Sequence, residues 1–129
     1  MIDLVAATPA DARLGQLGNE QLVAWLERGL PVVDIRRPYE WQATGVIAGS
    51  RLLTFFDEQG RFDLDRWLAE LGATIGRDDP FALVCRLGRR TDVLGRYLAG
   101  AQGFSGVHHL TGGIAWWRAA GLPVVAAEA

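Results

Sequence analysis

The sequence contains one cysteine, two histidines and no lysine, and each scarcity excludes a type of chemistry. Because Cys85 is the single cysteine, the chain cannot form an intramolecular disulfide framework, a CxxC redox pair or a multi-thiolate zinc site. All 13 basic residues are arginine, which excludes a Schiff-base lysine and the lysine-dependent phosphate loop of nucleotide hydrolases. The two histidines, His108 and His109, are adjacent, and without further ligands they give poor support for a metal centre.

Long hydrophobic runs and a strong excess of one charge are also absent. Charges or glycine and proline breaks interrupt every apolar run before the ~20 residues of a membrane-spanning helix. The first four residues lack the basic region of an export signal, so we expect a cytoplasmic protein with no membrane partner. A net charge of −2 does not create a positive electrostatic field that would attract a polyanion, and nucleic-acid binding is therefore not expected.

What is present suits one α/β domain. The 129 residues, half of them apolar, are sufficient for a single core. Apolar segments alternate with glycine, proline or aspartate breaks, as in alternating helices and strands. We expect strands at 31–35, 81–84 and 107–110, with 81–84 central, and a buried stretch at 46–47 and 52–53. We expect helices at 19–29, at 39–44, through 67–71 after a cap at Asp63 or Asp65, from about 91 to 99, and after 112–113.

Residues 81–91, FALVCRLGRRT, are the most informative segment. They predict a strand, a cysteine, a glycine-containing loop and the start of a helix. This order places Cys85 at the carboxyl edge of a parallel sheet, facing the opening where ligands usually bind. If the loop curls around the sulfur, its backbone N–H groups and the positive end of the next helix favour a thiolate over a thiol.

Three arginines in this loop, Arg86, Arg89 and Arg90, make it locally positive and suited to a small anion. We expect at least one to brace the loop by donating to its carbonyls, and the others to face the entrance. Gly88 allows the loop to close without a Cβ clash. The competing interpretation is that Cys85 is an inert core residue, as free cysteines often are. Burying three arginines beside it without an anionic partner would be costly, which favours a functional loop.

The chain resembles the rhodanese family over about residues 19–124, because four of its segments follow the order of the family's motifs. These segments are Val32 to Arg36 with Glu40 and Trp41, then Gly45 to Ser50, then Val84 to Thr91, and finally Gly103-Phe104 through Val107, Leu110, Gly112-Gly113 and Trp117. One departure is visible at Val46, where many members of the family have a histidine.

The resemblance implies a rhodanese-like α/β fold, with a central parallel sheet flanked by helices on both faces. It also suggests a division into three parts: an N-terminal segment at 1–18 that could add an edge strand, a single rhodanese-like domain at 19–125, and a short tail at 126–129. No metal or organic cofactor is implied.

The activity implied by the resemblance is sulfur transfer through a persulfide on Cys85. The thiolate would take the outer sulfur of thiosulfate, or of a persulfide donor, and pass it to cyanide or to a thiol. The expected partners are therefore a small anionic sulfur donor, a thiol or cyanide acceptor, and a protein that relays sulfur.

The resemblance also assigns roles to the surrounding residues. In the active-site loop, Arg90 would hold the conformation, Arg86 and Arg89 would influence donor selection, and Leu87, Gly88 and Thr91 would complete the ring. Outside the loop, Asp34 would lie nearby, and Arg36 and Glu40 would form a supporting ion pair or an ordinary exposed one. His108 and His109 should point to opposite faces of their strand, and packing roles are expected for them more than catalytic ones.

Two alternatives remain open. A cysteine-dependent phosphatase or arsenate reductase also holds an oxyanion in a loop between strand and helix. Such phosphatases place an arginine six positions after the cysteine, where this chain has Thr91, and arsenate reduction commonly uses further cysteines. The second alternative is a non-catalytic module, or one that only relays sulfur to a partner protein.

Overall fold

The computed structural model describes residues 2–128, which form a five-stranded sheet and six helices. All neighbouring strands are parallel, in the order β1-β5-β4-β2-β3. The strands are β1 Gly15–Leu17, β2 Val32–Asp34, β3 Arg51–Leu52, β4 Phe81–Val84 and β5 Val107–Leu110. The helices are α1 Leu4–Ala7, α2 Asn19–Glu27, α3 Pro38–Thr44, α4 Leu64–Gly72, α5 Arg89–Ala101 and α6 Gly113–Ala119. The predicted α/β class and the central position of the 81–84 strand are confirmed.

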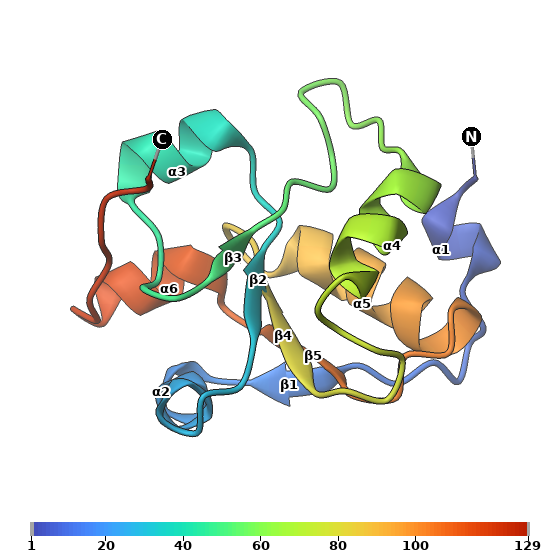
Figure 1. The fold of residues 1–129 in the computed structure, drawn as a ribbon, viewed down its shortest axis with the longest axis horizontal. Coiled ribbons are helices and arrows are strands. Elements are labelled where there is room, and N and C mark those ends of the chain that lie inside the picture. Colours follow the sequence, from blue (N-terminus) through green and yellow to red (C-terminus); the bar gives the residue numbers. More distant parts are fainter. Residues whose placement is uncertain (1, 129) are drawn as a thin grey trace.

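Helices cover both faces of the sheet, so the molecule has two hydrophobic cores (Figure 1). On one face, α2 and α6 contribute Trp25 and Trp117 to a cluster with the strand residues Val32 and Val84. On the other face, α4 and α5 cover a larger cluster, and α1 packs beside α5. A parallel sheet needs this cover because the strands are apolar on both sides.

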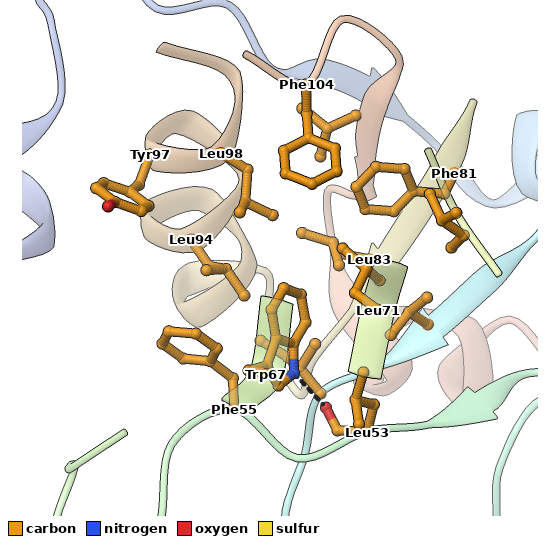
Figure 2. Packing of buried hydrophobic residues seen from close by; sticks show 14 of the residues in the cluster. Leu53, Phe55, Trp67, Leu71, Phe81, Leu83, Leu94, Tyr97, Leu98 and Phe104 are labelled. Atoms are coloured by element: carbon orange, nitrogen blue, oxygen red, sulfur yellow. Dashed lines mark hydrogen bonds between the residues drawn. The ribbon is translucent and has the colours of Figure 1, made fainter. Parts of the chain in front are cut away.

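The larger core explains the direction of the Cys85 side chain. Alternate residues of a strand point to opposite faces, and Phe81 and Leu83 of β4 point toward α4 and α5 (Figure 2). Cys85 continues this row and belongs to the same buried cluster. Within the cluster, Trp67 of α4 donates its indole N–H to the Leu53 carbonyl oxygen at 3.0 Å, so the polar edge of the ring is paired.

The ends of the elements differ from the predictions by a few residues. Helix α4 has Asp63 as its N-cap, and this side chain accepts from the N–H of Arg66 at 3.1 Å. Helix α5 begins at Arg89 rather than near residue 91, directly after Gly88. At the edge of the sheet, β1 pairs with β5 and brings Gln16 beside His109. In residues 2–128, every helix is too short or too polar to cross a membrane.

Candidate active site

The loop between β4 and α5 is held from below by α6. The carbonyl oxygens of Cys85 and Arg86 accept from the N–H groups of Ile114 and Ala115, at 2.9 and 3.0 Å. Gly88 has a φ of +85°, and a Cβ at this position would collide with the carbonyl oxygen of Thr111. Glycine is therefore required where the loop closes against the segment that joins β5 to α6.

The backbone N–H groups of residues 86–91 form an unpaired series. Within the part of the chain that the structure describes, none of them donates to an acceptor of the protein. Gly88 and Thr91 are nevertheless buried residues. The groups of residues 89–91 belong to the first turn of α5, where N–H groups have no acceptor within the helix, and such a turn is suited to an anion.

The Cys85 side chain is buried, which corrects the expectation that it faces an opening. Its exposed fraction is 1%, and it packs with the cluster that contains Phe81 and Leu83. The cause is the alternation of β4, which directs residue 85 toward the core beneath the loop. Access to the sulfur therefore requires the atoms that cover it to move.

The sulfur lies at one end of a series of polar contacts. Cys85 Sγ is 3.4 Å from Thr91 Oγ1, and this hydroxyl is 2.7 Å from His109 Nδ1. The other ring nitrogen, Nε2, is 2.7 Å from Gln16 Oε1. Burial lowers the pKa of His109; the nearby Asp92 carboxylate opposes this effect and Arg96 adds to it. The ring is therefore neutral near neutral pH.

His109 and Gln16 were not among the site residues that the sequence predicted. His108 and His109 do point to opposite faces: the His108 ring packs at a tilt against Trp25, and His109 lies on the Cys85 side. The alternation of β5 could have indicated this side, since the chain pairs Leu83 with His109 across neighbouring strands. Nothing in the sequence indicated that β1 would bring Gln16 to the ring.

Arg90 braces the loop through a carboxylate rather than through the loop carbonyls that we expected. Its guanidinium donates Nη1 and Nη2 to the two carboxylate oxygens of Glu40, each at 2.8 Å. Burial alone would raise the pKa of Glu40, but hydrogen bonds from Arg90 and from the Arg37 N–H, with the charges of Arg90 and Arg36, hold it below its usual value. Because Glu40 lies in α3, this ion pair ties the loop to that helix.

The predicted ion pair between Arg36 and Glu40 is wrong. Arg36 pairs instead with Asp34 at 2.9 Å, and each of these two side chains is 1% exposed. Its remaining donors reach Thr44 Oγ1 at 2.7 Å and the Gly45 carbonyl oxygen at 3.0 Å. The short connection after β2 turns Arg36 back onto Asp34, and Glu40 is then available to Arg90.

The other loop arginines face outward. Arg86 and Arg89 are exposed, and within residues 2–128 neither forms an ion pair with a carboxylate. Leu87 lies between them and is 46% exposed. A pocket of about 610 Å³ opens beside Arg86, and Arg118 of α6 and Tyr39 of α3 also line it. In the described chain, no cluster of three His, Cys, Asp or Glu side chains could hold a metal ion.

The fold and this loop define an α/β domain with a cysteine at the carboxyl edge of its central strand. Residues 18–120 match the family model of the rhodanese-like domain, and the chain belongs to that family. Two relatives, both named thiosulfate sulfurtransferase GlpE, come from Pseudomonas aeruginosa and Ectopseudomonas mendocina. The first is 33% identical over 103 residues, covering 80% of this chain and 83% of the relative. The second is 41% identical over 104 residues, covering 81% and 84%.

Solved structures agree on the fold. A rhodanese-related protein from Thermoplasma volcanium has a TM-score of 0.66 and 25% identity, covering 88% of this chain and 99% of its own. The polysulfide-sulfur transferase homodimer of Wolinella succinogenes has a TM-score of 0.69 and 22% identity, covering 95% and 83%. The predicted rhodanese-like fold is confirmed, and the curated relatives support sulfurtransferase activity in general terms.

Proposed function

We propose that this protein is a sulfurtransferase that carries sulfur as a persulfide on Cys85. In the first half of the reaction, the thiolate attacks the outer sulfur of thiosulfate. A new S–S bond forms, the original S–S bond breaks, and its electron pair leaves with sulfite. In the second half, cyanide or a thiolate attacks the terminal sulfur, and Cys85 leaves as a thiolate.

The observation that carries the proposal is the series of six backbone N–H groups after Cys85. None has an acceptor within the described part of the chain, and the series continues into the first turn of α5. Donors fixed in this way stabilise the negative charge of a thiolate or persulfide without reorganisation.

The donor we propose is a small anion such as thiosulfate. Exposed Arg86 and Arg89 flank the loop without carboxylate partners in residues 2–128, so they can attract an anion to it. Since Cys85 is 1% exposed, the reaction requires the atoms that cover the sulfur to move as the donor arrives. The name of the GlpE relatives supports thiosulfate as the donor to test first. A cytoplasmic location and a sulfur-relay partner remain predictions.

The test is the formation of thiocyanate from thiosulfate and cyanide. We expect turnover by the wild-type protein and none by Cys85→Ser, which keeps a similar volume but supplies no thiolate. Hydrolysis of a phosphate ester should be absent, because Thr91 stands where a phosphatase loop has its arginine. A robust phosphatase rate together with no thiocyanate would overturn the proposal. Sulfur loading without thiocyanate formation would instead assign a relay role.

A further inference from the structure

A continuous series of hydrogen bonds connects the buried sulfur to the surface, and the donor and acceptor of each bond can be assigned. The assignment starts at the surface end with Gln16, whose side-chain nitrogen donates to the Leu14 carbonyl oxygen at 3.4 Å. This orients the amide oxygen toward His109 Nε2, and Thr111 also donates its hydroxyl to that oxygen at 2.9 Å. An amide oxygen only accepts, so His109 Nε2 must carry a hydrogen.

A neutral imidazole with a hydrogen on Nε2 has an unprotonated Nδ1. The shortest contact of the Thr91 hydroxyl is to this nitrogen, at 2.7 Å, compared with 3.3 Å to the Gly88 carbonyl oxygen. The single hydroxyl hydrogen of Thr91 therefore points to His109. A lone pair of Thr91 Oγ1 is then available to accept from the Cys85 thiol, whose sulfur is 3.4 Å away.

We propose that His109 takes the proton of Cys85 through the Thr91 hydroxyl. The S–H bond of Cys85 breaks as an O–H bond forms on Thr91, and the original Thr91 proton moves to His109 Nδ1. The products are a thiolate and an imidazolium, and no electron is exchanged. Thr91 then donates to the thiolate, which stabilises it further. This inference rests on the proposed function, because a thiolate is needed only if Cys85 reacts.

The burial of the sulfur gives this path its purpose. Cys85 is 1% exposed, so its thiol has little direct contact with water that could take its proton. His109 lines a surface pocket of about 590 Å³. From α5, Asp92 and Arg96 face this pocket and pair with each other at 3.0 Å, and Arg89 lies at its rim. From β1 the neighbour is the uncharged Gln16, whose amide oxygen accepts from Nε2.

The first test is the pH dependence of persulfide formation. The rate is measured from the intact mass of the protein after brief exposure to thiosulfate. We expect His109→Asn and Thr91→Val to load about 100-fold more slowly than the wild type near neutral pH, the usual size of a base contribution. Their rates should recover at high pH, where the thiol ionises without help. Thr91→Ser, which keeps the hydroxyl, should load at close to the wild-type rate.

The matched control is His108→Asn. This neighbouring histidine points to the opposite face, where its ring packs at a tilt against Trp25 and Nδ1 is 2.8 Å from the Gly106 carbonyl oxygen. It should leave the pH profile unchanged. If His109 had only a structural role, His109→Asn would lower the loading rate by the same factor at every pH, and this result would overturn the inference.

A second test needs no variant. The ¹⁵N chemical shifts of the His109 ring in the reduced wild-type protein report which nitrogen carries the hydrogen. We expect the Nε2–H form, and an Nδ1–H form would overturn the proton path. Failure of the wild type to load sulfur at any pH, with the Nε2–H form present, would instead contradict the proposed function. The two failures are therefore distinguishable.

Discussion

Arg90 and Glu40 lie 50 positions apart in the chain and form a two-point ion pair, with both nitrogen–oxygen distances at 2.8 Å. Their side chains are 21% and 10% exposed, so solvent weakens this pair less than it weakens a surface pair. The pair joins the first turn of α5 to α3. The shape of the cysteine loop therefore depends on a helix that lies far from it in the sequence.

We predict that Arg90→Ala loses most sulfur transfer. The substitution leaves the largely buried Glu40 carboxylate without its partner and should cost about 2–3 kcal/mol of unfolding free energy. Activity should fall further than this loss explains, because the loop is no longer tied to α3. Chemical denaturation and a thiosulfate assay at equal folded fraction measure the two effects.

The control is Arg66→Ala. Arg66 also forms an ion pair, with Glu70 at 3.0 Å, but its side chain is 76% exposed and far along the chain from the loop. Its loss should change stability by at most about 0.5 kcal/mol and leave activity unchanged. If Arg90→Ala and Arg66→Ala gave the same activity, the bracing role of Arg90 would be refuted.

The contribution of Glu40 to the stability of the folded protein should depend on pH in the acid range. Its pKa is lowered from 4.5 in the folded protein, so the folded state prefers the carboxylate. The stabilisation is complete above pH 4.5 and is lost as the pH falls through the lower folded value. The stability difference between wild type and Glu40→Gln should therefore shrink below pH 4.5. A difference that grows on acidification would contradict the ion pair.

Gly88→Ala should disrupt the loop more than an equivalent change elsewhere. Gly88 and Gly60 both have positive φ, at +85° and +76°, but an added Cβ meets open space at Gly60 and the Thr111 carbonyl at Gly88. We expect Gly60→Ala to cost about 1 kcal/mol and to retain activity. Gly88→Ala should cost about 2–4 kcal/mol and lose sulfur transfer. Equal behaviour of the two variants would show that the close approach is unimportant.

The buried pair of Asp34 and Arg36 should resist removal of one partner but tolerate removal of both. Asp34→Leu leaves a guanidinium charge in a site where both side chains are 1% exposed, and it should cost about 3–5 kcal/mol. Asp34→Leu with Arg36→Met removes both charges and should recover most of this loss. Thermal unfolding of the three proteins tests this. If the double variant were less stable than Asp34→Leu alone, Arg36 would stabilise the fold through contacts other than its pairing with Asp34.

Much of the fold could be predicted from the sequence. The apolar run at 81–84 is typical of a strand covered on both faces, and it is β4, the middle strand. The glycine and arginines after Cys85 predicted a tight positive loop, which the structure has. Local composition is enough to predict the strand and the loop, because residues that are neighbours in the sequence determine both.

The contacts across the sheet could not be predicted in the same way. The resemblance assigned Glu40 to Arg36, yet Glu40 binds Arg90, 50 positions away. The contact between His109 and Gln16 spans 93 positions and depends on β1 joining the edge of the sheet. Such partners are determined by the order and register of the strands. The pattern of apolar and polar residues within one segment gives no information about either.

The most direct test of the account is the intact mass of the reduced protein after exposure to thiosulfate. We predict a gain of one sulfur atom, located on the peptide that contains Cys85, and its loss when cyanide is added. Cys85→Ser should show no gain under the same conditions. An unchanged wild-type mass, or an equal gain on Cys85→Ser, would contradict the persulfide account.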